Sequence, residues 1–241
     1  FELKPRDIFI HQTISKLSAA IAERTAVSVS GEQGLLTGTS GLLPIQQWYF
    51  EGAGDEGSRY NHFNQSVLLS IDKSVTPEVL SLAVDQLIVQ HDALRFRYYK
   101  KDEQWIQEYG TYKGELEIID LRLKRSSLAK FIKEHAEKYQ RSPDIEKGEL
   151  VRFVLIQTPK RETNNRILII IHHLAVDGVS WRILLEDLEL LRTGLEKGSK
   201  PDLGNKGSSY RQWYEALEQY GKSKRLLSQS KYWQEVVSSY E

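Results

Sequence analysis

Residues 166–188 read R-I-L-I-I-I-H-H-L-A-V-D-G-V-S-W-R-I-L-L-E-D-L, and the rest of the chain is organised around them. The apolar, β-branched run from Ile167 to Ile171 is too short for a helix, so it predicts a buried strand. The strand ends on His172 and His173. Because neighbouring side chains on a strand point to opposite faces, only one of these two imidazoles can serve a cavity.

A turn and a helix follow this strand. The helix is predicted by apolar residues at helical spacing, which are Ile183, Leu184, Leu188 and Leu191. Asp177 or Ser180 can cap its start, and Gly178 permits a backbone conformation or a close approach that a Cβ atom would hinder. These residues also have ordinary structural roles, because a histidine at a strand end is commonly a hydrogen-bonded structural group and an aspartate before a helix is commonly a cap.

The combination of these residues is more specific than its parts. His172-His173 with Asp177-Gly178 resembles the His-His-x-x-x-Asp-Gly signature of the condensation superfamily, whose members act on acyl thioesters and have a chloramphenicol acetyltransferase-like fold. Condensation domains of nonribosomal peptide synthetases usually continue with Gly-Trp-Ser. Residues 179–182 read V-S-W-R instead, and this resembles the sequence of epimerization domains.

Two segments before the histidines carry the same resemblance. Residues 41–51 predict a helix that starts at a proline and buries an aromatic face, and they resemble the first epimerization motif, Pro-Ile-Gln-x-Trp-Phe. Residues 90–98 are similar to the superfamily motif Arg-His-x-x-Leu-Arg-x-x-Phe, from which Gln90 and Tyr98 depart. The arginine of that motif is structural, so we interpret Arg95 as a buried or half-buried ion-pair partner.

The C-terminal part of the chain resembles the segments that follow the histidine motif in this superfamily. Residues 208–214 contain Ser-Ser-Tyr-x-x-Trp, and residues 231–233 contain Tyr-Trp. An aromatic stripe at helical spacing is normally core. We therefore expect two helices with a buried face made of Trp213, Leu217, Tyr220, Leu226, Leu227 and Trp233.

Strand and helix patterns are mixed along the rest of the chain. Strands are predicted at 61–71, 96–99, 104–109, 115–119 and 150–157, and helices at 77–90 and 127–139. This order suits an α/β fold, a two-layer sandwich with a mixed sheet. The resemblance implies a chloramphenicol acetyltransferase-like lobe.

The composition excludes several classes of protein. Lys plus Arg and Asp plus Glu both number 33, so no basic stripe indicates nucleic-acid binding, and no apolar run reaches the length of a membrane span. The chain has no cysteine, which excludes disulfides, thiol nucleophiles and zinc–thiolate sites. No secretory signal pattern is present at the start, and we expect a cytoplasmic protein.

The N-terminal region is predicted to be a separate part. Residues 1–24 resemble the C-terminal helix of a peptidyl carrier domain, without the serine that carries phosphopantetheine. Residues 25–40 are rich in Ser, Thr and Gly and predict a linker. Residues 41–241 resemble the N-terminal lobe of an epimerization domain. Because the chain has no methionine and starts at Phe1, we expect it to be a piece of a longer polypeptide.

The resemblance implies an epimerase that converts the L-aminoacyl or peptidyl thioester on the upstream carrier domain to the D form. It assigns the α-proton transfer to His173, gives His172 a packing role, and leaves Asp177 to organise the loop. A histidine can act as base or acid near neutral pH, and the start of the Ser180 helix is a candidate to stabilise the enolate oxygen.

The remaining expectations concern cofactors and partners. No metal or cofactor is expected in this lobe, because the substrate arrives on the 4′-phosphopantetheine arm of the adjacent carrier domain. The second partner is the C-terminal lobe of the same epimerization domain. Its Glu-Gly-His-Gly-Arg-Glu type segment carries a catalytic glutamate and has no match in this chain. We therefore expect the fragment alone to be nearly inactive.

Three alternatives stay open. A condensation domain, which forms a peptide bond between two carrier-bound substrates, shares the histidine motif, although Val179-Ser180-Trp181 argues against it. A degenerate lobe that only docks carriers is disfavoured by the intact His172, His173 and Asp177 set. A coenzyme-A acyltransferase is compatible with His-x-x-x-Asp-Gly alone.

Overall fold

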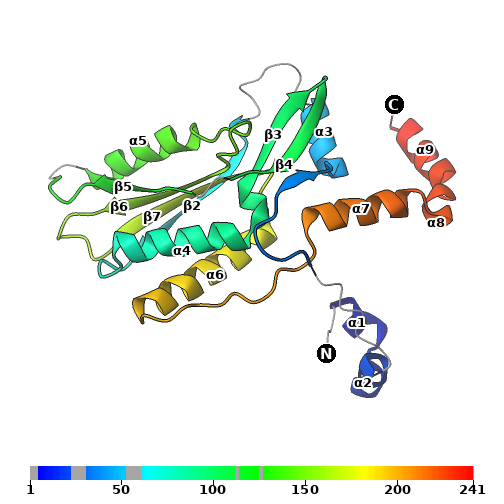
Figure 1. Ribbon diagram of the computed structural model, residues 1–241, viewed down its shortest axis with the longest axis horizontal. Helices are drawn as coiled ribbons and strands as arrows, with labels where there is room; N and C mark the ends of the chain where they lie inside the picture. Colours follow the sequence, from blue (N-terminus) through cyan, green and yellow to red (C-terminus); the bar gives the residue numbers. More distant parts are fainter. Residues whose placement is uncertain (1–4, 23–30, 53–60, 112–113, 125–126, 241) are drawn as a thin grey trace. The chain divides into compact units, whose positions relative to one another are not determined.

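The apolar strand before the two histidines lies inside a four-stranded mixed sheet (Figure 1). In the computed structural model, which describes residues 5–22, 31–52, 61–111, 114–124 and 127–240, this strand is β7, Asn165–His172. It pairs antiparallel with β2, Asn64–Ile71, and with β6, Val151–Gln157. The last strand, β5, Leu116–Asp120, runs parallel to β6. The sheet is therefore mixed, as predicted.

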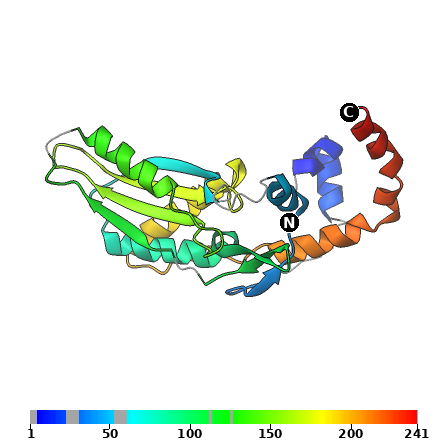
Figure 2. The same ribbon diagram turned by 90° about the horizontal axis from the view of Figure 1, so that it is seen from above.

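Helices cover both faces of this sheet. Helices α4, Pro77–Gln90, and α6, Gly178–Glu196, lie on one face, and α5, Leu128–Gln140, lies on the other (Figures 1 and 2). The residues of β7 alternate between the two cores, so that Ile169 packs in the larger core and Ile170 packs in the core under α5. A strand that is covered on both faces reads as a continuous apolar run, which explains the sequence of β7.

A second sheet is built from three antiparallel strands in the order β1, β4, β3. These strands are Gly38–Ser40, Gln104–Tyr109 and Phe96–Lys101. Arg95 ends the 3-10 helix η2, Asp92–Arg95, immediately before β3, and only 2% of its surface is exposed. Its guanidinium pairs with Asp92 and donates to the Gly110 carbonyl oxygen at 2.6 Å. Arg95 thus holds the buried ion-pair position.

Helix α3, Pro44–Gly52, starts at a proline as predicted, but its buried face is only partly aromatic. Phe50 is buried and stacks on Trp105 with a centroid distance of 4.2 Å. The other buried residue of the helix is Gln46, whose amide donates to the Gln107 side chain at 2.7 Å. Trp48 leaves 70% of its surface exposed, so the predicted aromatic face is not buried as a whole.

The C-terminal helices also differ from the prediction. They are α7, Tyr210–Gly221, α8, Lys224–Leu227, and α9, Ser230–Ser238, and none of their residues is buried. Trp213 and Trp233 expose 52% and 53% of their surface. Helical periodicity identifies an apolar face, but it does not supply a partner for that face. The prediction that these side chains form core is therefore wrong for this chain.

Contacts divide the chain into two compact units, residues 1–31 and 32–241. The first contains α1, Pro5–Ile10, and α2, Ile14–Ala22, which starts where the Thr13 side chain accepts from the Lys16 N–H group at 3.3 Å. Within the second unit, Leu36 is buried in the core, and β1 pairs with β4. Of the linker predicted over 25–40, residues 32–40 thus belong to the second unit, and residues 25–30 lie outside the described ranges.

Candidate functional site

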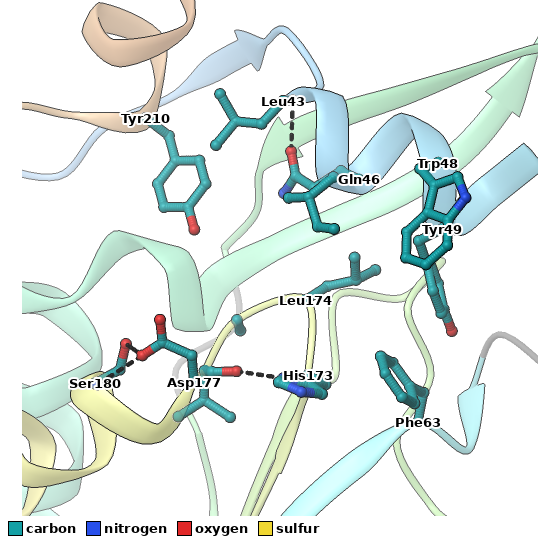
Figure 3. Close-up of a pocket in the computed structure, with 13 residues that line it drawn as sticks. Leu43, Gln46, Trp48, Tyr49, Phe63, His173, Leu174, Asp177, Ser180 and Tyr210 are labelled. Atoms are coloured by element: carbon teal, nitrogen blue, oxygen red, sulfur yellow. Dashed lines mark hydrogen bonds between the residues drawn. The ribbon is translucent and has the colours of Figure 1, made fainter. Parts of the chain in front are cut away.

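A cavity of about 450 Å³ lies where β7 ends and α6 begins (Figure 3). Its walls come from α3, the start of β2, the turn after β7, and the start of α7. The lining residues are Leu43, Ile45, Gln46, Trp48, Tyr49, Phe63, His173, Leu174, Ala175, Val176, Asp177, Ser180 and Tyr210. Most of these side chains are apolar, and the ionisable ones are His173, Asp177 and the tyrosines.

The two histidines occupy different environments at the end of β7. His172 is fully buried, and its Nδ1 accepts from the Leu174 N–H group at 3.2 Å. The His173 backbone N–H donates to the Phe63 carbonyl oxygen at 2.7 Å, which continues the pairing of β2 with β7 by one residue. Its imidazole is half-buried and lines the cavity. This arrangement agrees with the prediction that only one of the two rings serves a cavity.

The hydrogen bonds of the His173 ring define its tautomer. Its Nδ1 lies 2.7 Å from the Val176 carbonyl oxygen (Figure 3). Because a carbonyl oxygen only accepts, Nδ1 carries the proton of the neutral ring, and Nε2 carries the lone pair. The Gln65 side-chain nitrogen lies 3.3 Å from this Nε2. A neutral His173 can therefore act as a base through Nε2.

Asp177 is the N-cap of α6. One of its oxygens accepts from the N–H groups of Val179 and Ser180 at 3.1 and 2.7 Å, and from the Ser180 hydroxyl at 2.6 Å. The Ser180 hydroxyl is the main cause that lowers the pKa of Asp177, together with the backbone donors. Asp177 is therefore ionised at neutral pH and caps the helix, whereas Ser180 supports the cap.

These contacts correct two expectations about the start of α6. The N–H groups of Val179 and Ser180 already donate to Asp177, so they do not offer a free site for an enolate oxygen. Gly178 has no positive φ, and a Cβ atom built on it would meet nothing within 4 Å. No contact with the described residues therefore requires a glycine at position 178.

Trp181 links the helix to the neighbouring strand. Its indole N–H donates to the side-chain oxygen of Gln65 at 2.7 Å, and its ring packs against the main core. Gln65 was not singled out from the sequence, where it is one polar residue at the start of β2. A polar side chain in a predicted strand does not reveal this role, because the pairing of Gln65 with Ile171 is known from the structure alone.

Tyr210 is a second residue whose site role the sequence did not reveal, although it lies in a motif. Figure 3 shows its hydroxyl pointing into the cavity from the start of α7. Burial is the main cause that raises the pKa of Tyr210, and the nearby Asp177 carboxylate acts in the same direction. Its hydroxyl is therefore neutral near pH 7 and can donate a hydrogen bond inside the cavity.

Arg95 does not belong to this cavity, and its contacts lie with η2 and the loop after β4. In the described ranges, no three His, Asp or Glu side chains come together as metal ligands would. The helices of the same ranges are also too short or too polar to cross a membrane. The cavity thus combines an imidazole, a hydroxyl donor and an ionised cap in apolar surroundings.

The sequence profile of the condensation domain family matches residues 37–241. The chain belongs to the condensation domain family. Its relatives include a linear gramicidin synthase polypeptide of Brevibacillus parabrevis, which is 41% identical over 96% of this chain. Surfactin synthase subunit 1 of Bacillus subtilis is 36% identical over 98% of the chain. The chain spans only 4% and 6% of these two relatives.

Solved structures of condensation-family domains have the same fold. The epimerization domain from the third module of tyrocidine synthetase B superposes with a TM-score of 0.77 at 33% identity, over 86% of this chain and 45% of that domain's chain. A starter condensation domain of rhizomide synthetase gives a TM-score of 0.71 at 20% identity, over 85% and 49% of the two chains. The chain therefore spans less than half of each solved chain.

Proposed function

We propose that this chain is the N-terminal lobe of an epimerization domain in a nonribosomal peptide synthetase. The observation that carries the proposal is the His173 ring, which lines a largely apolar cavity while its Nδ1 is held at the Val176 carbonyl oxygen. The sequence V-S-W-R at 179–182 and the 33% identity to an epimerization domain support this activity over peptide-bond formation.

In the proposed reaction, His173 removes the α-proton of a thioester-linked residue and a second group returns a proton to the other face. Once the hydrogen bond from the Gln65 amide is released, Nε2 of His173 takes the proton, and the C–H electron pair moves into the enolate of the thioester. The ionised Asp177 lies close enough to favour the positive charge that His173 then carries. The neutral Tyr210 hydroxyl is a donor available to the substrate in the same cavity.

The proposed partners are the upstream carrier domain and a second lobe. A thioester on a 4′-phosphopantetheine arm would enter the cavity, while the acid of the second step would come from the C-terminal lobe. The exposed apolar residues of α7–α9, including Trp213 and Trp233, support a partner surface there. Residues 1–24 are proposed to be the end of the carrier domain, which is consistent with their separate compact unit.

The second candidate is a condensation domain. It is favoured by the match to the condensation profile and by the condensation domains among the solved structures of this fold. In such a domain, His173 would assist attack of an amine on a thioester. The two reactions therefore share the cavity and the base, and they differ in the second substrate.

The test uses the full synthetase that contains this chain. The upstream carrier is loaded with an L-aminoacyl pantetheine, and the released residue is analysed for chirality and for deuterium at the α-carbon after incubation in deuterated water. The proposal expects D-residue and α-deuterium, and His173→Ala should lose both. Peptide-bond formation with a second loaded carrier, in the absence of α-exchange, would support the condensation candidate instead.

A further inference from the structure

We propose that Gln65 is a positioning residue that holds His173 in the tautomer needed for proton removal. The catalytic consequence rests on the function proposed above, whereas the tautomer itself can be measured without any reaction. Three hydrogen bonds run from Trp181 through Gln65 and His173 to Val176.

Trp181 determines which way the Gln65 amide faces. An indole Nε1–H can only donate, so the Gln65 atom 2.7 Å from it must be the oxygen. The other end of the amide is then the NH2 group, and this group lies 3.3 Å from Nε2 of His173. Rotating the amide by half a turn would set two donors against each other at Trp181.

The neighbours on both sides of the His173 ring favour the same tautomer, with the proton on Nδ1. On one side, the Val176 carbonyl oxygen accepts a proton from Nδ1 at 2.7 Å. On the other side, the Gln65 NH2 group needs an acceptor, which only an unprotonated Nε2 provides. The Nε2–H tautomer would face a donor at Gln65 and would direct its Nδ1 lone pair at a carbonyl oxygen. Both contacts therefore disfavour a proton on Nε2 before the reaction.

Gln65 lies beside the site without lining the cavity. It is half-buried on β2 and pairs in register with Ile171, two residues before His173. Its neighbours on the strand have other partners, since the Asn64 amide donates to the Gln140 carbonyl oxygen and the Ser66 hydroxyl accepts from the Gln140 amide. Ser66→Ala is therefore a matched control, because it removes one side-chain hydrogen bond from the same strand on the side away from His173.

The experiment measures the protonation of each ring nitrogen of His173 by ¹⁵N NMR on the 241-residue chain labelled at its histidines. The His173 signals are assigned by their loss in His173→Gln. At a pH where histidines are neutral, the wild type and Ser66→Ala should show a protonated Nδ1 and an unprotonated Nε2. Gln65→Met, which removes the amide, should lower the ratio of the Nδ1–H to the Nε2–H tautomer by about tenfold.

Gln65→Glu gives a sharper outcome with a side chain of the same size. One carboxylate oxygen can still accept from Trp181, and the second oxygen now faces Nε2 as an acceptor. We expect a proton on Nε2 at neutral pH in this variant. If Gln65→Met does not keep the fold, as judged by thermal melting, Gln65→Glu carries the test.

A tautomer ratio in Gln65→Met and Gln65→Glu equal to that of Ser66→Ala would refute the proposal. In the full synthetase, kcat for α-proton exchange should be proportional to the fraction of His173 in the Nδ1–H tautomer. It should therefore fall most in Gln65→Glu, with little change in KM, because Gln65 does not line the cavity. Absence of exchange in the wild type would count against the proposed function, and it would leave the tautomer result standing.

Discussion

Replacing Asp177 with alanine removes the cap of α6 at the wall of the cavity. The lost contacts are the three hydrogen bonds that one carboxylate oxygen accepts, from two backbone N–H groups and the Ser180 hydroxyl. Loss of an N-cap aspartate typically costs about 0.5–2 kcal/mol. Three donors lose their acceptor, but the Asp177 side chain that accepts from them is exposed. We therefore expect the free energy of unfolding to fall by about 1–2 kcal/mol at neutral pH.

The pH dependence of this effect follows from the pKa of Asp177. The pKa is lower in the folded chain than the usual value of about 3.9, with the Ser180 hydroxyl as the largest cause. A carboxyl with a lowered folded pKa contributes full stability above its unfolded pKa and loses that contribution as the pH falls through the folded value. The difference between wild type and Asp177→Ala should therefore shrink on going from about pH 7 to about pH 3.

Urea unfolding of the 241-residue chain at the two pH values measures both effects. Asp177→Asn keeps a good capping side chain and loses only the charge, so it should cost less than the alanine variant at neutral pH. Ser127→Ala removes the neutral cap of α5 and should cost a similar amount at both pH values. An Asp177→Ala effect that is absent at neutral pH, or that grows on acidification, would contradict this reasoning.

The remaining predictions concern the histidines, the core and the exposed helices. His173→Ala should lower α-proton exchange in the full synthetase by roughly 10²–10⁴-fold, as for a positioned acid–base group, whereas His172→Ala should act mainly by lowering the melting temperature, because its ring is fully buried. Leu36→Ala should lower the free energy of unfolding in urea by about 2–4 kcal/mol, because Leu36 is packed in the main core. Trp213→Ser should change this free energy by less than about 0.5 kcal/mol in the 241-residue chain, because its ring is half exposed, but it should lower the melting temperature of the two-lobed domain.

Each of these predictions has a result that would contradict it. A folded His173→Ala variant with wild-type exchange would remove His173 from the reaction. A Leu36→Ala variant as stable as the wild type would mean that residues 32–40 are linker and not part of the packed lobe. If Trp213→Ser destabilises the single lobe as much as the two-lobed domain, the exposed face of α7 is not a partner surface.

The sequence predicted elements well where local chemistry marks their ends. Helix α4 begins at Pro77 after the Thr76 cap and ends at Gln90, as predicted, and β4 spans the predicted residues 104–109. In both cases the signal lies in neighbouring residues: a cap and a proline for the helix, and alternation with a turn for the strand. The mixed α/β fold was predicted from signals of the same kind, and the structure confirms it.

The features that failed depend on contacts between distant residues. The burial of α7–α9 requires a partner surface, which helical spacing does not reveal. The role of Gln65 depends on an indole 116 positions away in the chain and on the tautomer of a histidine 108 positions away. A single polar residue on a strand contains no information about either distance. The cavity around His173 could therefore be anticipated from the sequence, but the hydrogen bonds that prepare its ring could not.

The position of β1 has a consequence for the design of chimeric proteins in which this lobe is exchanged with that of a relative. A junction at residue 41 would respect the sequence motifs, yet it would replace Leu36 and the strand Gly38–Ser40 with foreign residues. The recipient would have to supply a matching strand for β4 and a counter-ion for Arg211, which pairs with Glu32 at 2.7 Å. A junction before Glu32 would transfer these native contacts together with the lobe that needs them.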